Sequence, residues 1–505
     1  MHEAAQQNLA SFKATLSNLN GCISALDAEI VELERCLAVK RCEMDVAQTK
    51  RSDLEEKINR SLSEIYGGYI EYLMPDLLRC IFYQVCFEDR FNNYYALQPF
   101  QLAAVNRHWR SVALSTPRIW AHVVAGPTIF FYSWTEADVS RVQLLLERSQ
   151  SAPLHVYFPI IRGHFLLPMD CFSRAFKLAA KNMSRWKHAY VRYTAWHGGN
   201  TNDLDLSVNQ HFKSLHGQKP NLTHLDIETR TSAVDATPFL IDAPSLRSLC
   251  IAGNIFHSVP VTGFPCITKL TIKYLDNIKT LISFLIPCAP TLQSLRLNNR
   301  DDAADAKDPS LSITLPVLRK LKLFGNIPHD EYGLVLPALQ YLSLSRTYLF
   351  ESCTVFLRSV ADTVIHLKMV NFLTSDFDSD MLEILSVLQN VKQLEFGIDW
   401  TTSNGNGIAI KDGVFKYLTE RVPPMWPALQ SISIANASIT DGSSIGDELV
   451  ALVQHRNPPL QDTDHGSHNQ VLARLTSVKI AYDGIGENVQ RDIDCILRRD
   501  RVARR

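Results

Sequence analysis

The amino-acid sequence predicts an α/β solenoid with parallel strands on its concave face, preceded by a small helical domain and an N-terminal coiled coil. Three patterns predict this fold class. Apolar residues keep a heptad spacing from Leu9 to Ile65, two short apolar stripes follow, and an apolar phrase then recurs many times. Recurrence every ~20 to 50 residues is typical of stacked repeat units. We therefore divide the chain into a coiled coil (1–66), a helical domain (71–124), a solenoid (139–490) and a basic tail (491–505).

The composition is that of a folded protein. Of the 505 residues, 46% are hydrophobic and 20% are charged, and the formal net charge is −1. This charge gives no electrostatic reason to expect nucleic acid or an acidic membrane as a partner. The 11 cysteines are scattered and form no C-x-x-C pair, which fits reduced thiols. Because the sequence shows no signal peptide and no apolar run of about eighteen residues, we expect a cytoplasmic or nuclear protein.

The first segment has the two apolar seam positions of a coiled coil. Only Lys40, Arg51 and Ser61 interrupt the seam. A strict 3.5-residue period over this length favours a coiled coil, which needs a second helix and so predicts self-association through residues 9–65 or a helical partner. An amphipathic helix packed on the body of the protein is the alternative. The seam consists of Leu9, Phe12, Leu16, Leu19, Ile23, Leu26, Ile30, Leu33, Leu37, Lys40, Met44, Ala47, Arg51, Leu54, Ile58, Ser61 and Ile65.

The helical domain contains two apolar stripes at helical spacing. Pro75 suits the first turn of a helix, and its stripe is formed by Leu78, Ile81, Phe82 and Val85. A second helix is expected to begin near Pro99 and to end at Thr116-Pro117, because the residue before a proline avoids the α region. The stripe of this second helix consists of Leu102, Val105, Trp109 and Val112.

Three phrases in this domain resemble the F-box, and in particular the F-box-like domains of many fungal proteins. They are Leu-Met-Pro-Asp-Leu-Leu-Arg-Cys-Ile-Phe (73–82), Val-Asn-Arg-His-Trp-Arg-Ser-Val-Ala (105–113) and Pro-Arg-Ile-Trp (117–120). The chain departs from the family pattern at Met74, which is inserted, at Asp76, where Glu is common, and at Asn106, where Cys is common. The resemblance implies docking onto the Skp-family adaptor of a cullin–RING ubiquitin ligase. It assigns this contact to Leu73, Pro75, Leu78, Ile81, Phe82, Val105 and Trp109.

The third segment repeats a phrase of three apolar residues separated by two variable residues and then one. The first seven intervals between copies are 21 to 27 residues long, and the last two are 38 and 46. Phrase and period resemble the leucine-rich repeat. Asn254 and Asn326 stand where that family places its asparagine ladder, so the array is expected to be irregular. The copies begin at Leu222, Leu246, Ile267, Leu292, Leu318, Leu339, Val364, Val391, Leu429 and Leu475, with a weaker early copy at Trp186.

Each copy has a simple physical interpretation. The phrase is a turn into a short strand whose alternate side chains face the core. Between the copies we expect helices at 277–286, 353–360, 381–388 and 414–419, with Asp276 and Asp412 as N-caps, and a lead-in helix and strand at 142–148 and 153–157. The two long intervals are expected to carry loops at 401–407 and 457–469.

The resemblance implies a substrate-recognition subunit of an SCF-type ubiquitin ligase, in which the concave strand face binds a protein. The alternative is a non-catalytic scaffold in which the helical domain only caps the repeats, since the end of an array exposes its core. The candidate substrate-binding residues occupy variable positions of the phrases. They are His224, Arg247, Lys269, Arg296, Lys320, Lys322 and Tyr341.

The sequence gives little reason to expect catalysis. It contains no G-x-S-x-G, no H-E-x-x-H and no phosphate-binding G-x-x-x-x-G-K pattern. Asp464, His465 and His468 could supply metal ligands, but a polar surface loop is the simpler interpretation because no second ligand group is evident. We therefore expect no enzyme activity, no cofactor and no metal in this chain.

Overall fold

The computed structural model describes most of the chain. The described residues are 2–66, 73–87, 97–124, 135–162, 169–195, 217–229, 243–252, 266–275, 278–299, 312–325, 333–345, 353–370, 379–397, 414–421, 423–435, 442–458, 472–481 and 487–502. The chain divides into two compact units, residues 1–81 and 82–505, and each is considered by itself.

The first unit is dominated by α1 (His2–Tyr66), an unbroken helix of 65 residues. The predicted helix is therefore confirmed. Leu26 and Leu33 on its seam are each 58% exposed, so the seam is uncovered in the single chain. The polar seam residues Lys40 and Arg51 form ion pairs with Glu43 and Glu55 along the helix. Such pairs support an isolated helix by ~0.2–0.5 kcal/mol each.

The described part of the helical domain contains three helices, where two were expected. They are α2 (Pro75–Phe87), α3 (Gln98–Val105) and α4 (Arg107–Leu114). The prediction of one helix through Val105 and Trp109 was wrong, because Asn106 is extended and interrupts it. The side chain of Asn106 accepts a hydrogen bond of 2.8 Å from the Trp109 N–H and so caps α4. Asparagine favours this role because its amide oxygen replaces a missing helical acceptor.

A short helix connects this domain to the first strand. It is η2 (Pro117–Trp120), and β1 (His122–Val124) follows it directly. Trp120 is fully buried, and its indole N–H donates to the Ala113 carbonyl at 2.7 Å. Phe82, at the start of the second unit, packs against Trp109 with ring centroids 5.1 Å apart. These contacts connect Phe82, α4 and η2 within the second unit.

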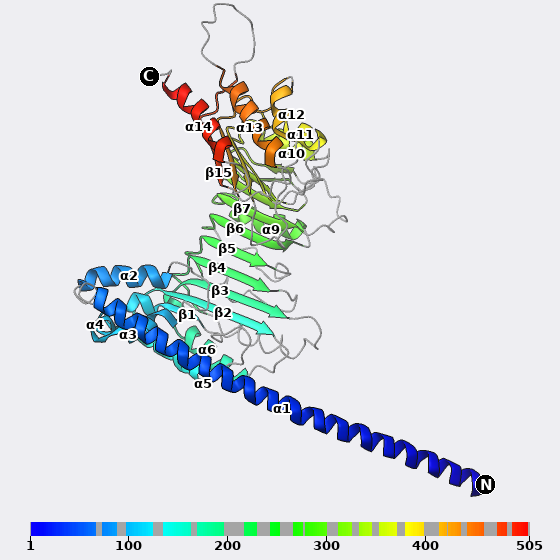
Figure 1. Ribbon diagram of the computed structural model, residues 1–505. Helices are drawn as coiled ribbons and strands as arrows, with labels where there is room; N and C mark the ends of the chain where they lie inside the picture. The colour runs from blue at the N-terminus through cyan, green and yellow to red at the C-terminus, as the bar shows by residue number, and fades with distance from the viewer. Residues whose placement is uncertain are drawn as a thin grey trace, which may run out of the picture. The chain divides into compact units, whose positions relative to one another are not determined.

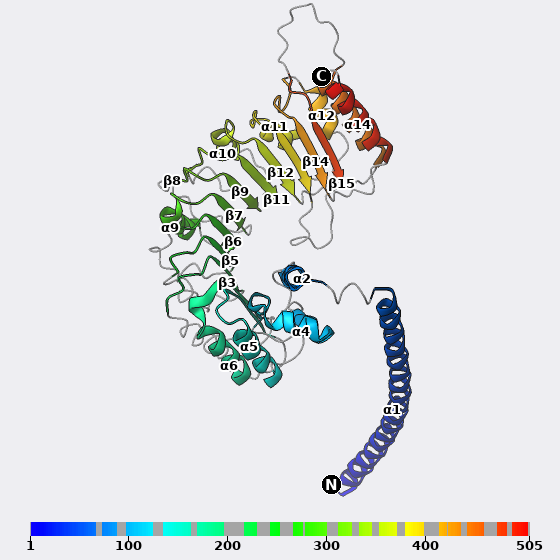
Figure 2. The same ribbon diagram turned by 90° about the vertical axis from the view of Figure 1, so that its left-hand side faces the viewer.

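The second unit is built on a sheet of thirteen parallel strands, whose order follows the chain without reversal (Figures 1 and 2). This arrangement confirms the predicted α/β solenoid. A separate parallel pair is formed by β8 (Ser312–Thr314) and β10 (Gly333–Val335). After β1, the main sheet contains β2 (Leu154–Arg162), β3 (Trp186–Ala195), β4 (His224–Thr229), β5 (Ser248–Ala252), β6 (Lys269–Leu275), β7 (Ser294–Asn299), β9 (Lys320–Phe324), β11 (Tyr341–Ser345), β12 (His366–Val370), β13 (Gln393–Gly397), β14 (Ser431–Ala435) and β15 (Ser477–Ala481).

Helices connect many of these strands, and Figure 2 shows α9 and α10 on the outer side of the curved sheet. The predicted helices correspond to α5, α9, α10, α11 and α12, whereas α6, α13 and α14 were not predicted. The expected caps Asp276 and Asp412 lie outside the described residues. The connecting helices are α5 (Glu136–Arg148), α6 (Met169–Ala180), η3 (Met183–Arg185), α9 (Ile278–Cys288), α10 (Cys353–Val360), α11 (Ser379–Leu385), α12 (Val414–Glu420) and α13 (Gly442–Arg456), and α14 (Glu487–Val502) follows the last strand.

The basic C-terminal tail differs from its prediction. Residues 491–502 belong to α14, in which Ile493 and Leu497 are buried while Arg498 and Arg499 are exposed. The four-residue spacing of the two apolar residues places them on one face of the helix. Burial of this face explains why a segment rich in arginine is ordered here.

The core follows from the strand alternation. From β4 to β14, the second and fourth residues of each phrase-bearing strand are buried, as Leu321 and Leu323 of β9 illustrate, and in β15 the fourth residue, Ile480, is partly buried. Because successive side chains of a strand point to opposite faces, the first, third and fifth residues face away from this core. No helix among the described residues is both long and apolar enough to cross a membrane.

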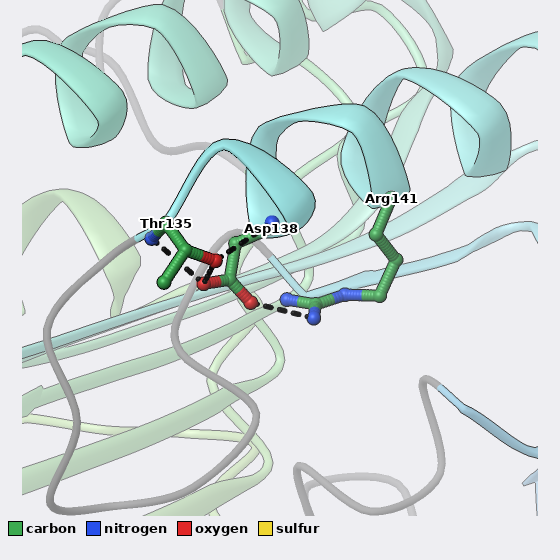
Figure 3. A network of polar contacts seen from close by, with 3 residues as sticks. All are labelled: Thr135, Asp138 and Arg141. Atoms are coloured by element: carbon green, nitrogen blue, oxygen red, sulfur yellow. Dashed lines mark hydrogen bonds and ion pairs between the residues drawn. The ribbon is translucent and has the colours of Figure 1, made fainter.

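The first connecting helix, α5, begins with a polar network (Figure 3). The Asp138 carboxylate accepts hydrogen bonds from the Thr135 N–H at 3.0 Å and hydroxyl at 2.8 Å, and it accepts another from Arg141 at 2.7 Å. Burial alone would raise the pKa of Asp138, but the bonds from Thr135 and Arg141 outweigh it and hold this pKa below its ordinary value. The network therefore stabilises α5 while Asp138 is ionised, and its contribution is lost as the pH falls through the lowered pKa.

Candidate protein-binding face

The face of the sheet opposite the core carries rows of side chains that cross all thirteen strands. Parallel pairing aligns the residue directly before the first buried apolar position that the strands share, so one row runs from strand to strand along the array. It consists of His122, His155, His188, His224, Ser248, Lys269, Ser294, Lys320, Tyr341, His366, Gln393, Ser431 and Ser477. Apart from His122, the residues of this row are partly or fully accessible.

Four histidines begin this row. The rings of His155 and His188 lie 4.3 Å apart between centroids, and those of His188 and His224 lie 4.1 Å apart. His122 is buried, and burial lowers its pKa to about 4, so this ring is neutral at physiological pH. Sequence reasoning singled out only His224. A signal was present, because each of four successive strands carries a histidine directly before a buried apolar residue.

A polar cluster lies further along the same strands. The Tyr190 hydroxyl donates to Glu228 at 3.3 Å, and Arg192 and Lys273 approach the same carboxylate at 3.9 and 4.0 Å. These side chains come from β3, β4 and β6, which brings together residues far apart in the chain. Sequence reasoning missed this cluster, since nothing in the spacing of single residues indicates a charge pair across strands.

Asp226 lies beside this cluster, and the pKa of its carboxyl group is raised. Burial is the main cause that raises its pKa to about 6, against the opposing effects of Lys273 and the Cys250 thiol. Its Oδ1 atom is buried and has no hydrogen-bond partner among the described residues. A carboxylate in this environment opposes folding once it ionises.

We predict that Asp226→Asn stabilises the protein at pH 8. Because the folded pKa is raised, the favourable contribution of the protonated acid is complete below about pH 4 and is lost as the pH rises through about 6. The variant should therefore gain ~1–3 kcal/mol at pH 8 and little at pH 4.5. Urea denaturation of both proteins at the two pH values measures this. A loss of stability at pH 8 would instead identify Asp226 as a paired, ionised group.

The middle of the face is basic. Strands β6, β7 and β9 present five cations and no carboxylate at their described outward positions, and two of these cations lie near an aromatic ring. The Nζ atoms of Lys320 and Lys322 lie 6.0 and 5.9 Å from the centroid of Tyr341. The summed field of such a patch attracts negatively charged partners. Its cations are Lys269, Lys273, Arg296, Lys320 and Lys322.

Six of the seven candidate substrate-binding residues occupy these rows. His224, Lys269, Lys320 and Tyr341 belong to the row listed above, while Arg296 and Lys322 pair with each other two residues further along their strands. Arg247 lies one residue before β5. Its backbone carbonyl accepts hydrogen bonds from the Thr268 and Lys269 N–H groups. Its exposed side chain is thus next to the rows and not within them.

The far end of the face carries an ion-pair cluster. Glu395 on β13 pairs with Lys368 and approaches His366 Nε2 at 3.4 Å, and both partners belong to β12. The hydrogen bond with His366, together with the bond and charge of Lys368, lowers the pKa of Glu395 to about 2 against the effect of burial. An acid therefore accompanies the basic side chains at this end of the face, whereas the described outward positions in the middle carry cations and no carboxylate.

The candidate adaptor-binding residues separate into buried and exposed groups. Leu78 and Phe82 are fully buried, and Leu73 and Trp109 are partly buried. Pro75, Ile81 and Val105 are exposed. Leu77, which sequence reasoning passed over, is also exposed, and its four-residue separation from Ile81 places both on one face of α2.

No group of three or more His, Cys, Asp or Glu side chains in the described ranges could hold a metal ion. The loop residues Asp464, His465 and His468 lie outside those ranges, as do Asn254 and Asn326 and the predicted loop 401–407. The arrangement offers hydrogen bonds, charge and aromatic surface along an extended face. Such a surface suits a macromolecular partner.

The continuous parallel sheet and its open face define an α/β solenoid of the leucine-rich-repeat type. No protein-family model matches the chain, and no curated protein matches it. A similar solved structure is the crystal structure of a structural-genomics target protein from Bacteroides fragilis. It is 14% identical, has a TM-score of 0.27, and the match covers 61% of this chain and 70% of that chain. This similarity is too low to support an inference about function.

Proposed function

We propose that this protein is a substrate-recognition subunit of an SCF-type cullin–RING ubiquitin ligase. The observation that carries the proposal is the apolar face of α2 formed by Leu77 and Ile81, which stays exposed within a segment that resembles the F-box. The same helix buries Leu78 and Phe82, so its two faces have different partners. Apolar side chains left in water on a short helix favour a helical protein partner.

In this proposal the Skp-family adaptor covers the exposed residues, and the substrate protein binds the open rows of the sheet. The basic stretch on β6, β7 and β9 favours a substrate segment that carries negative charge. This chain supplies no reacting group. It places the substrate near the ubiquitin-carrying subunit, and proximity supplies the rate enhancement.

Capture of a purified Skp-family adaptor by the full chain tests the proposal. We predict that Leu77→Asp with Ile81→Asp abolishes capture, because each buried leucine or isoleucine contributes ~1.5–3 kcal/mol and an aspartate in its place is desolvated without a partner. Both residues are exposed, so the variant should fold, whereas substitutions of Leu78 or Phe82 would damage the core. Surface plasmon resonance with immobilised adaptor gives the affinity.

The matched control is Leu144→Asp on α5, which also places an acid on an exposed leucine. It should bind the adaptor like the parent. If a well-folded parent does not bind the adaptor, or if the control loses binding equally, the ligase proposal is wrong.

A structural cap is the second candidate role for the helical domain. Trp120 and Ile119 are fully buried beside β1, and the indole of Trp120 bonds back to α4. These contacts cover the first strand of the array, which would otherwise expose its core. Failure of adaptor binding would leave this role as the function of residues 82–124.

We further propose that α1 self-associates with a second copy of the chain. Its uncovered leucine and isoleucine seam is continuous from Leu16 to Leu37, and a copy of the same helix has a seam of the same length and spacing. Polar Lys40 and Arg51 mark the point at which the seam weakens.

A further inference from the structure

A pocket of about 550 Å³ opens at the beginning of the strand face. Its residues come from the last turns of α2, from η2 and from the entry ends of the first four strands. This volume lies within the ~300–1,000 Å³ range of small-ligand sites. The lining residues are Tyr83, Gln84, Phe87, Arg118, Ala121, Pro153, His155, Lys187, His188 and His224.

The pocket is rich in positive charge. Arg118 and Lys187 are permanent cations, and neither forms an ion pair within the described part of the chain. Three imidazoles add ring nitrogens that can take part in hydrogen bonds with a ligand. None of the ten lining residues is acidic. The acids of β4 lie beyond His224 along the strand, where Glu228 is already engaged by Tyr190, Arg192 and Lys273.

Aromatic rings hold the shape of the pocket. The Phe87 ring meets the His155 ring edge-on, with centroids 5.3 Å apart, and it stacks on Tyr83 at 4.6 Å. The Arg118 guanidinium lies 4.9 Å from the Tyr83 centroid. Thr223 Oγ1 is 2.8 Å from His224 Nδ1, and this contact orients that ring. The cationic groups are therefore presented from rigid walls.

We propose that this pocket binds a phosphate monoester. Its three terminal oxygens carry up to two negative charges and accept several hydrogen bonds at once. Guanidinium, ammonium and imidazole groups around one cavity match that demand, whereas a single carboxylate would leave several donors unused. The ester belongs either to a free small molecule or to a phosphorylated side chain of a protein. The inference does not depend on adaptor binding, so each proposal can fail without the other.

Isothermal titration of the full chain with three probes tests this site. The probes are inorganic phosphate, phenyl phosphate and a phosphoserine peptide, in a buffer free of phosphate and sulfate. We expect Arg118→Gln with Lys187→Gln to weaken binding at least tenfold, to about a tenth of the parent affinity or less, because two charge-assisted bonds are lost. Both side chains are exposed, so folding should be retained. As a second variant, Gln84→Glu places an acid in the pocket and should also weaken binding.

The control is Lys177→Gln with Lys181→Gln, which removes two positive charges from exposed positions in and just after α6, outside the pocket and the strand face. It should bind like the parent. Equal loss in the control, or no parent binding of any probe at about 1 mM, overturns the proposal. Tighter binding of phenyl phosphate than of the peptide supports the site with a small-molecule source, and the reverse order supports it with a phosphorylated protein.

Discussion

Under the self-association proposed for α1, replacement of Leu26 and Leu33 by aspartate is expected to yield monomers. Both leucines occupy the seam of α1, and each is 58% exposed in the single chain. Burial of one leucine contributes ~1.5–3 kcal/mol, so two leucines in each of two chains contribute ~6–12 kcal/mol to association. Their loss should weaken self-association by more than about a thousandfold, since about 1.4 kcal/mol corresponds to a factor of ten. Sedimentation equilibrium at micromolar concentrations measures this.

The chain offers a closely matched control for that experiment. Val31 and Val39 are also exposed apolar residues of α1, but they lie off the heptad seam. Aspartate at these two positions adds the same charge to the same helix and should leave self-association unchanged. A parent that is monomeric at micromolar concentration, or a control that dissociates equally, would contradict the proposal.

Replacement of Arg456 by methionine is expected to destabilise the C-terminal repeats by ~2–4 kcal/mol. The guanidinium is 1% exposed and donates to the carbonyls of Met425, Trp426 and Pro427 at 2.7, 3.2 and 3.4 Å. Methionine keeps much of the volume but leaves these acceptors unsatisfied. Trp426 has a φ of 50°, which is unusual for a bulky residue, so the turn depends on this support.

Hydrogen exchange followed by mass spectrometry locates the effect. Since solenoid stability is a nearest-neighbour property, amides of β14 and β15 should exchange faster, and those of β3 and β4 should not change. Arg498→Met on the exposed side of α14 is the control and should change neither region. Unchanged exchange in β14 and β15 of the Arg456 variant would show that the turn does not need the guanidinium.

The parts of the fold that were predicted correctly are those with a local period. The heptad seam of α1 repeats at each second turn, and the phrase around Leu321 and Leu323 repeats once per strand. Periodicity identifies an element because the backbone geometry of helices and strands is itself periodic. The break at Asn106 was missed for the opposite reason. One capping side chain ended α3 and began α4 within a continuous apolar stripe.

The candidate site was predictable only in part. Alternation placed Lys269, Lys320 and Tyr341 on the open face, and the register of the strands confirms that they belong to one row. The apolar stripe of α2 did not distinguish Leu78 from Ile81. Helical spacing puts residues on neighbouring faces, but only the packing of other elements decides which face is covered.

The sequence by itself determined the order and type of the repeating elements, because each repeat carries the apolar spacing of its own strand. The tertiary structure decided which side chains from different repeats meet. The rings of His155, His188 and His224 lie side by side only because the parallel register of β2, β3 and β4 aligns these three positions. Arg456 is buried only because α13 returns to the turn at Trp426, thirty residues earlier in the chain. Both outcomes depend on contacts across strands and helices, which no local pattern in one segment encodes.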